Sequence, residues 1–370
     1  MRIVITGADG FIGQNLKVRL AELGYTNTVG ITRNTAPNEF QRALSDADFV
    51  FHLAGVNRTQ NLADFIAGNA TLTQDLSAAL AKTGRKIPVV LASSAQAELD
   101  NPYGKSKLAA EVALQQYALA TGAPVYLFRL VNVFGKWCRP NYNSAVATFC
   151  HNMVRGLPIT IHDPASPLML VYVDDVVDAF AALLSTPVAV SEFIEICPTY
   201  STTVGEVVDT LRTFAESRAT LLSPRVGVGM VGALYSTYIS YLPPVAFSYS
   251  VPLHQDARGE FAEMLKTPDC GQFSYFTAHP GITRGEHYHH SKTEKFLVVK
   301  GTAHFGFRHI VTGETHELVV HGGEARIVET VPGWVHNITN TGDDELIVML
   351  WANNIFDPQK PDTVALKVVQ

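Results

Sequence analysis

The spacing of apolar segments changes near residue 250, and this change bounds the possible folds. Up to about residue 185, short runs rich in β-branched residues alternate with longer segments of helical periodicity. The predicted strands are RIVITG, FVFHLAG, PVVLASS and PVYLFRLVN, and the predicted helices are QNLKVRLAELG, TLTQDLSAALAKTG and KSKLAAEVALQQYALATG. This alternation predicts a Rossmann-type α/β domain, in which helices cover both faces of a parallel sheet.

Beyond residue 250, short apolar segments follow one another closely. The predicted strands are FLVVKG, AHFGFRHI, HELVVHGG, ARIVETV and ELIVMLWA. Gly, Pro, Asn and Asp separate them, which predicts an antiparallel sandwich or barrel. We therefore expect two domains, residues 1–243 and residues 250–370, joined by the proline-containing segment 241–252.

Composition excludes several classes of protein. The 370 residues suit two domains, and the net charge of −6 gives no reason to expect nucleic acid or an anionic membrane as a partner. The four cysteines form no CxxC pair, which argues against a disulfide framework and fits a reducing compartment. Neither a signal peptide nor an apolar run of about 18 residues is present. We expect a soluble, cytoplasmic protein.

A glycine pattern lies at the first predicted strand–helix turn. ITGADGFIG places Gly7, Gly10 and Gly13 between the strand and the helix. Such glycines allow a tight turn, close approach of the backbone to a pyrophosphate, and packing of helix on strand. The second predicted strand ends in TVGITRN, where Arg33 stands in place of an acidic residue that would bind a ribose hydroxyl. Because arginine suits a 2′-phosphate, we expect NADPH as the cofactor rather than NADH.

Tyr103 and Lys107 are candidate catalytic residues. In SSAQAELDNPYGKSK they lie four residues apart, so they project to the same side of a helix. A neighbouring ammonium lowers the pKa of a phenol and lets it act as a general acid or base. Ser94, at the end of the preceding strand, is placed to bind a substrate oxygen. The predicted cofactor-binding residues are Gly7, Gly10, Phe11, Ile12, Gly13, Arg33, Leu53, Ala54, Gly55, Tyr103 and Lys107.

Over roughly residues 1–240 these motifs resemble the extended short-chain dehydrogenase/reductase family, whose members mostly act on nucleotide sugars. The resemblance implies that Ser94, Tyr103 and Lys107 form a catalytic triad. RLVNVFG and YVDDVV resemble segments that border the sugar nucleotide in that family. The chain has Ala95, Gln96 and Ala97 where the 4,6-dehydratases of the family carry an Asp–Glu pair, which argues against a dehydratase.

A second candidate site lies in GITRGEHYHHSKTEKFLVVKG, residues 281–301. On a strand, His287 and His289 point to one face because the side-chain period is two. A turn at HSKT would return the chain so that Glu294 faces the same pocket, and His336 in VPGWVHNITN is the predicted fourth ligand. Three imidazoles and one carboxylate suit a divalent ion such as Zn²⁺, Fe²⁺, Mn²⁺ or Ni²⁺. This ion could be catalytic or structural.

This spacing resembles the cupin family of jelly-roll proteins. The first motif matches along its whole length, whereas in the second Pro332 directly precedes Gly333. DARGEF, residues 256–261, also resembles a segment of sugar-nucleotide 3,5-epimerases, which are cupin-shaped. The sequence does not identify a base for epimerisation, and the residues considered are Lys266, Tyr275, Tyr288 and His304.

The whole chain is similar to a family of bifunctional capsular-polysaccharide enzymes. The shared stretches include AGVNR, DNPYGKSK, FGKWCRPNYNS, YSTYISYLP and NNIFDP. The resemblance implies a zinc cupin that epimerises C3 of a UDP-4-keto-2-acetamido-2,6-dideoxyhexose. It further implies reduction at C4 with NADPH to UDP-2-acetamido-2,6-dideoxy-L-talose, on the route to UDP-N-acetyl-L-fucosamine, by a homodimer that associates through the cupin.

Three other interpretations stay open at this stage. The chain could be a single-site sugar-nucleotide reductase whose cupin is a structural or dimerisation module. It could join a reductase to an iron oxygenase, for which the sequence offers no support. It could also be a sugar-nucleotide epimerase that retains NAD, although Arg33 favours a cofactor that exchanges.

Overall fold

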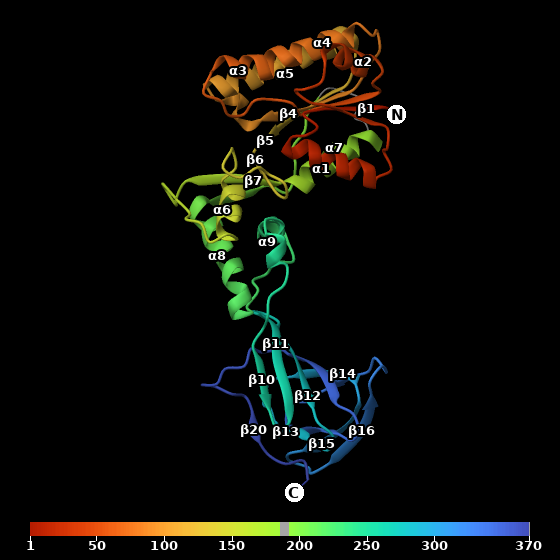
Figure 1. Cartoon of the computed structure of the whole chain (residues 1–370), viewed down its shortest axis with the longest axis vertical. Helices are drawn as coiled ribbons and strands as arrows, with labels where there is room; N and C mark the ends of the chain where they lie inside the picture. The colour runs from red at the N-terminus through yellow and green to blue at the C-terminus, as the bar shows by residue number, and fades with distance from the viewer. Residues whose placement is uncertain (186–191, 370) are drawn as a thin grey trace. The chain divides into compact units, whose positions relative to one another are not determined.

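The computed structural model describes residues 1–185 and 192–369 (Figure 1). The chain divides into two compact units. The first unit contains residues 1–211 and 232–242, and the second contains residues 212–231 and 243–370. Among the described residues, no helix is both long enough and apolar enough to cross a membrane.

A parallel sheet forms the centre of the first unit. Its strands, in spatial order, are β2 (Thr28–Ile31), β1 (Ile3–Thr6), β3 (Phe49–His52), β4 (Val89–Ser94), β5 (Val125–Leu130) and β8 (Glu192–Phe193). β1 pairs in parallel with both β2 and β3, which lie on opposite sides of it. The strand order therefore reverses direction at β1. Such a point of reversal leaves a crevice at the carboxyl ends of the strands, where α/β proteins bind ligands.

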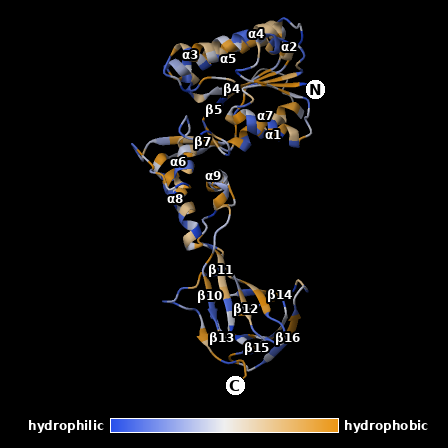
Figure 2. Cartoon of the chain, viewed as in Figure 1, coloured by the Kyte–Doolittle hydropathy of each residue, from blue (hydrophilic) through white to orange (hydrophobic). Residues whose placement is uncertain are grey.

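Helices cover both faces of this sheet (Figure 1). The helices on one face are α1 (Phe11–Glu22) and α7 (Val173–Ser185), and those on the other are α2 (Pro37–Ser45), α4 (Leu72–Ala81) and α5 (Pro102–Thr121). Alternate residues of each strand point to opposite faces of the sheet, and each face has its own hydrophobic core. Ile5 packs in the core that includes Leu16, whereas Val4 packs in the core that includes Leu114. Figure 2 shows the apolar strands between these layers. The predicted Rossmann-type fold is confirmed.

The remaining elements lie in the first unit or at its boundaries along the chain. A separate sheet contains β6 (Asn132–Phe134), β7 (Pro167–Tyr172) and β9 (Tyr200–Thr203). The other helices are α3 (Ala63–Phe65), a π-helix (Ile66–Thr71), a 3₁₀ turn (Ala95–Glu98), α6 (Ala145–Met153), α8 (Val204–Thr220), α9 (Gly229–Ser240) and a 3₁₀ turn (Pro244–Ala246).

Two antiparallel sheets form the second unit. The first has the order β10 (Leu253–Asp256), β11 (Gly259–Thr267), β12 (Gly271–Ala278), β19 (Leu346–Ala352), β14 (Glu294–Lys300) and β17 (Ile327–Glu329). The second has the order β16 (Thr315–His321), β15 (Thr302–His309), β18 (Trp334–Asn340), β13 (Thr283–Tyr288) and β20 (Val364–Ala365). Phe276 and Phe296 from one sheet share a core with Phe305 from the other. The predicted antiparallel all-β domain is confirmed.

Two candidate functional sites

The glycine turn after β1 lies directly against the segment that follows β3. Gly7 has a φ of +69°, and a Cβ added there would lie 2.7 Å from the backbone nitrogen of Ala54. A Cβ on Gly13 would lie 2.3 Å from the carbonyl oxygen of Gly7. Larger residues would therefore push α1 and the β3 segment away from the turn. Glycine is required at both positions by packing, and at Gly7 by backbone conformation as well.

This turn lies at the point where the strand order reverses. α1 begins at Phe11 with Gly10 as its N-cap, and no side chain caps it. Its first N–H groups can therefore serve an anion. Leu53, Ala54 and Gly55 follow β3 at the same edge, and Arg33 lies in an exposed turn just after the neighbouring β2. The residues at this edge fit a dinucleotide, with the pyrophosphate on the glycine turn.

Ser94, Tyr103 and Lys107 are brought together by β4 and the start of α5. Ser94 ends β4 and is 9% exposed. Asn101 caps α5 by accepting a hydrogen bond from the Gly104 amide at 2.7 Å. A Cβ on Gly104 would lie 2.2 Å from the Gln96 carbonyl oxygen, so the first turn of α5 packs closely on the segment after Ser94. The Tyr103 phenol lies close enough to Ser94 for this serine to influence its pKa.

Burial controls the electrostatics of this group. Burial raises the pKa of Tyr103, and the interaction with Ser94 opposes the rise. Lys107 is 6% exposed, and its Nζ donates to the Ala92 carbonyl oxygen at 2.6 Å. Burial lowers the pKa of Lys107 to about 8, while the charge of Glu111 acts in the opposite direction. The sequence predicted a lowered phenol pKa, but at Tyr103 desolvation outweighs the opposing interaction with Ser94.

A buried hydrogen-bond chain lies behind this edge, and sequence reasoning missed it. His52 is 1% exposed, with Nδ1 2.7 Å from the Thr6 hydroxyl and Nε2 2.9 Å from the Thr73 hydroxyl. The Thr73 hydroxyl donates to the Asn69 carbonyl oxygen, so it must accept from His52 Nε2–H. The ring is therefore neutral, with Nδ1 accepting from Thr6. Burial lowers the pKa of His52 to about 3.

A second buried group lies on the same side of α5, one turn further along the helix. Glu111, one turn after Lys107, is 1% exposed and accepts from the Ser93 hydroxyl at 2.5 Å. Its carboxylate also accepts from Arg129 Nη2 at 2.8 Å, and Arg129 stacks on Phe193 at 4.4 Å. Ser93 and Arg129 are register partners on β4 and β5. This ion pair joins α5 to the two strands beneath it.

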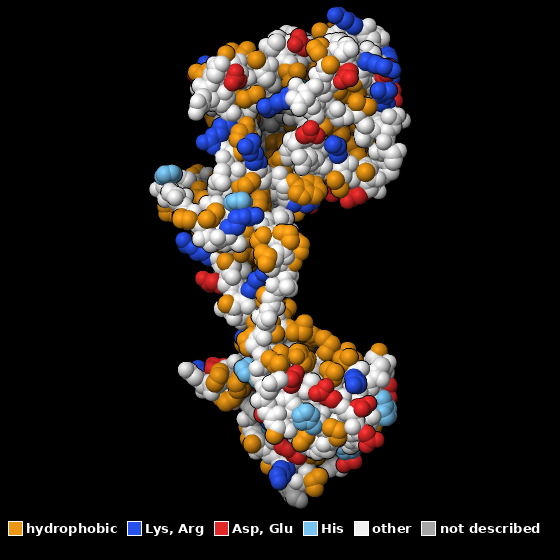
Figure 3. Space-filling model, viewed as in Figure 1, with side chains coloured by type: hydrophobic (Ala, Val, Ile, Leu, Met, Phe, Trp, Pro, Cys, Tyr) orange, Lys and Arg blue, Asp and Glu red, His pale blue; other side chains and the backbone are white. Residues whose placement is uncertain are grey.

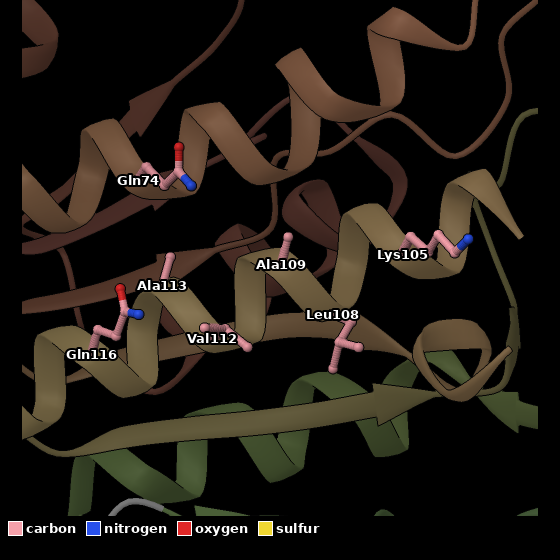
Figure 4. A pocket seen from close by; sticks show the side chains of 7 residues that line it. All are labelled: Gln74, Lys105, Leu108, Ala109, Val112, Ala113 and Gln116. Carbon is pink, nitrogen blue, oxygen red and sulfur yellow. The ribbon is translucent and has the colours of Figure 1, made fainter. Parts of the chain in front are cut away.

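A shallow groove of about 390 Å³ lies on the opposite side of α5 (Figure 4). It is lined by Gln74, Lys105, Leu108, Ala109, Val112, Ala113 and Gln116. Lys105, Leu108 and Val112 are about half a helical turn away from the side that carries Tyr103 and Lys107. The groove is therefore separate from the candidate catalytic residues.

In the second unit, His287, His289, Glu294 and His336 form a cluster. Their ligand atoms all lie within 4.8 Å of one another. His289 Nε2 and His336 Nε2 each lie 3.4 Å from Glu294 Oε2. The His287 ring centroid is 4.8 Å from that of His289 and 4.6 Å from that of His336. The arrangement can hold one ion between the three rings and the carboxylate.

The two sheets contribute different members of this cluster. His287 on β13 pairs with His336 on β18, while Glu294 begins β14 in the other sheet. The expected return turn at HSKT is wrong, because the segment between β13 and β14 carries the chain from one sheet to the other. Strand periodicity gives the face of a side chain but not the sheet that the next strand joins. Glu294 therefore approaches the histidines from across the sandwich.

The charge on Glu294 and an unpaired nitrogen on His336 bear on what this cluster can bind. Burial alone would raise the pKa of Glu294, but hydrogen bonds with His289 and His336 and the Lys292 ammonium together hold it well below its usual range. Lys292 Nζ lies 2.8 Å from Glu294 Oε1, a neighbour that sequence reasoning missed. His336 Nδ1 is buried without a hydrogen-bond partner. This donor set, with a buried polar atom left unpaired, fits a divalent cation such as Zn²⁺.

The four residues considered for epimerisation lie outside this cluster. Lys266 pairs with Glu263 at 3.1 Å, and His304 Nε2 lies 3.3 Å from Glu317. Tyr288 follows His287 on β13, and Tyr275 lies on β12. No hydrogen bond among the described residues singles out one of them as a base.

Comparisons with known proteins agree with the two-part fold. The model of the "NAD dependent epimerase/dehydratase family" matches residues 3–197, and that of the "Polysaccharide biosynthesis C-terminal domain" matches residues 254–364. A UDP-glucuronic acid 4-epimerase from Bacillus cereus, solved with NAD, shares the fold of the first part. Its TM-score is 0.57 at 20% identity, with 65% of this chain and 96% of that chain covered.

Two proteins match along the whole chain. The UDP-2-acetamido-2,6-β-L-arabino-hexul-4-ose reductase of Pseudomonas aeruginosa is 53% identical, over 100% of this chain and 99% of the relative. The crystal structure of the capsular polysaccharide assembling protein CapF from Staphylococcus aureus is 42% identical with a TM-score of 0.91, over 99% of this chain and 100% of that chain. The chain therefore belongs to the NAD-dependent epimerase/dehydratase family and, over its whole length, to the group of capsular-polysaccharide proteins that includes CapF.

Proposed function

We propose that this protein is a sugar-nucleotide reductase of capsule or O-antigen biosynthesis that uses a nicotinamide cofactor. The observation that carries the proposal is the grouping of Ser94, Tyr103 and the buried Lys107 at the sheet edge that holds the Gly7 turn. A ketone bound there would meet both a hydrogen-bond donor and a general acid. The whole-length match to the P. aeruginosa reductase supports the substrate class.

Each residue has a distinct role in this reaction. Bound NADPH would supply the hydride to C4 of the ketone. Ser94 would hold the carbonyl oxygen by a hydrogen bond, and Tyr103 would donate its proton to that oxygen. The Lys107 ammonium would stabilise the phenolate left on Tyr103 and would bind the cofactor ribose. NADPH is proposed over NADH because Arg33 lies after β2, where the 2′-phosphate would be bound.

For the second unit we propose a metal-containing cupin that epimerises the same substrate. The proton at C3 of a 4-keto sugar is acidic, because the carbanion is stabilised by the neighbouring carbonyl group. His287, His289, Glu294 and His336 would hold the ion, and a bound Zn²⁺ would polarise the ketone. Inversion at C3 of a UDP-4-keto-2-acetamido-2,6-dideoxyhexose before reduction at C4 would give UDP-2-acetamido-2,6-dideoxy-L-talose, on the route to UDP-N-acetyl-L-fucosamine.

We also propose a homodimer that associates through the second unit. Tyr275, Met349 and Leu297 are register partners on β12, β19 and β14, on the sheet face opposite to the core. They are half-buried, and Ile327 beside Leu297 is 52% exposed. Figure 3 also shows hydrophobic side chains gathered on the surface of this unit. Sedimentation should give a dimer for the wild type and a lower mass for Met349→Glu if this face is the interface.

Product analysis tests the function directly. With a UDP-4-keto-2-acetamido-2,6-dideoxyhexose and NADPH, the wild type should form the L-talose sugar, as identified by NMR. Ser94→Ala should slow reduction sharply. His287→Ala should form no L-talose product but should still bind NADPH. L-talose formation by His287→Ala would instead favour the alternative, a single-site reductase whose cupin is a structural or dimerisation module.

A further inference from the structure

A carboxylate far along the chain holds the loop between two members of the histidine cluster. Asp362 Oδ1 accepts from the His290 amide at 2.9 Å. Its Oδ2 accepts from the Ser291 amide at 2.7 Å, the Ser291 hydroxyl at 2.8 Å and the Lys292 amide at 2.8 Å. These four hydrogen bonds hold residues 290–292, three of the four residues that separate His289 from Glu294. A charged acceptor makes such bonds stronger than neutral pairs.

The backbone of the same residue orients a ligand. His289 Nδ1 is hydrogen-bonded to the Asp362 carbonyl oxygen, which can only accept. Nδ1 must therefore carry a proton. When the ring is neutral, as in a metal ligand, the lone pair is on Nε2, the nitrogen that faces Glu294, and an ion there would replace the Nε2–H contact with the carboxylate. A partner on the outer nitrogen of a metal-binding histidine fixes its tautomer and ring orientation.

The segment that contains Asp362 continues into a strand that lies antiparallel beside the strand of His287. β20 pairs with β13, so that His287 is opposite Ala365. Glu286, which has a φ of +60°, accepts from the Val368 amide at 2.8 Å and from Asn337 on β18 at 2.9 Å. Residues 362–368, here called the C-terminal strap, therefore contact two of the four cluster members directly, His287 and His289, as well as residues beside them.

The strap is also anchored independently of the cluster. Arg308, which is 9% exposed, donates from Nε to the Val368 carbonyl oxygen at 2.8 Å and from Nη2 to that of Lys367 at 2.7 Å. Val368 is itself 5% exposed and packs against Gly306. A buried guanidinium and an apolar side chain thus hold the end of the strap on β15. These anchoring contacts involve none of the four cluster members.

We propose that the C-terminal strap is an integral part of the metal site, with Asp362 as the positioning residue that holds His289 and the 290–292 loop for coordination. This inference rests on the proposed metal-binding function of the cluster. Without Asp362, all four ligands remain in the chain, but the loop between His289 and Glu294 loses its fixed geometry. Because such supporting contacts typically change metal affinity by about 10–100-fold, we expect a loss of that size.

The experiment measures Zn²⁺ affinity of the full chain by competition with a chromophoric chelator. The variants are Asp362→Ala and Asp362→Asn, and the matched control is Asp357→Ala. Asp357 lies nearby in the chain. Among the described contacts, its carboxylate accepts only from the Gln359 amide, at 2.9 Å. We expect Zn²⁺ to bind Asp362→Ala about 10–100-fold more weakly than the wild type. Asp362→Asn should also bind Zn²⁺ more weakly. Its side-chain –NH₂ group would replace one of the two acceptor oxygens and would face an N–H donor of the loop. Asp357→Ala should match the wild type.

The spectrum of the Co²⁺-loaded protein provides a second readout, because its visible bands report coordination geometry. We expect the Asp362 variants to change these bands and Asp357→Ala to leave them unchanged. If Asp362→Ala does not fold, the Zn²⁺ affinity and the Co²⁺ spectrum of Asp362→Asn test the proposal instead. Wild-type affinity and spectrum in a folded Asp362 variant would overturn the role of the strap, whereas failure of the wild type itself to bind Zn²⁺ would overturn the proposed metal site.

Discussion

At the scale of single residues, the chemistry of the first unit depends on where protons are held. The Tyr103 phenol keeps its proton because burial raises its pKa. The Lys107 ammonium, which is nearly enclosed, has a pKa lowered to about 8. A phenol that stays protonated is suited to give a proton to an oxygen that gains charge, which is the direction needed for ketone reduction.

Replacing the proposed acid tests this role. Tyr103→Phe removes the donor, so kcat for NADPH-dependent reduction should fall by about 10²–10⁴-fold, while NADPH affinity measured by fluorescence should change little. Tyr117→Phe is the matched control, because Tyr117 lies on the same helix and its hydroxyl donates to the Ile87 carbonyl oxygen. An unchanged kcat in Tyr103→Phe would contradict the assignment.

The pH dependence follows from Lys107. Its ammonium is present below the pKa of about 8, so kcat/KM for reduction should fall as pH rises through 8. Unfolding should not explain the loss. Between about 8 and the ordinary value of 10.5 the unfolded chain binds more protons, so this residue makes the free energy of unfolding rise with pH. A profile that stays flat to pH 10 would argue against a charged Lys107 in the reaction.

Arg33 tests the choice of cofactor. Removing a charge-assisted hydrogen bond, worth about 1.5–3 kcal/mol, should weaken NADPH binding by about 10–100-fold in Arg33→Ala. NADH binding should be unchanged, since NADH has no 2′-phosphate. Arg42→Ala removes another exposed arginine, on α2, and serves as the control in the same titration. Equal losses for both cofactors would contradict 2′-phosphate binding.

At the scale of secondary-structure elements, a neutral histidine joins β1, β3 and the start of α4. His52 stays unprotonated in the fold down to a pH of about 3, whereas the unfolded residue binds a proton near 6.5. The unfolded chain therefore binds more protons in this window, so lowering the pH destabilises the fold. From pH 6.5 to 5 the expected loss is about 2 kcal/mol.

Urea unfolding followed by the far-UV helix signal measures this effect. The wild type should lose stability between pH 7 and 5, and His52→Gln should be less stable at pH 7 but show a smaller further loss. Removal of the partner in Thr6→Val should leave the pH dependence in place, since His52 is still present. Identical pH slopes for the wild type and His52→Gln would contradict the assignment of this effect to His52.

Local patterns predicted the elements better than the contacts between them. The strand–helix alternation and the glycines near Gly7 were sufficient for the Rossmann-type sheet, because both express short-range geometry. The spacing of His287, His289 and Glu294 likewise selected residues that meet in space. The crossing between sheets at the 289–293 segment was not predicted, because periodicity carries no information about sheet membership.

The supporting residues of both sites could not be found from sequence. Asp362 lies about 70 positions from the loop that it holds, in a segment with little regular structure. Glu111 looks like an ordinary helix residue until the strands beneath it are placed. The raised pKa of Tyr103 depends on its enclosure, which spacing alone does not reveal.

At the scale of the whole molecule, each candidate site is built within its own unit. The residues around Tyr103 belong to the first unit, and the cluster around His287 belongs to the second. The two proposed reactions share a substrate but require different groups: a phenol and a hydride donor for reduction, and a base beside a polarised ketone for epimerisation. Each activity should therefore survive inactivation of the other site.

Hydrogen–deuterium exchange at C3 distinguishes two catalytic sites from one. A UDP-4-keto-2-acetamido-2,6-dideoxyhexose is incubated in D₂O without NADPH and followed by NMR with wild type, His287→Ala and Tyr103→Phe, after circular dichroism has established that each variant is folded. Two catalytic sites predict that deuterium enters C3 with wild type and Tyr103→Phe but not with His287→Ala. Absence of exchange with every protein, or exchange that depends on Tyr103 rather than His287, would contradict the proposal that the second unit is catalytic.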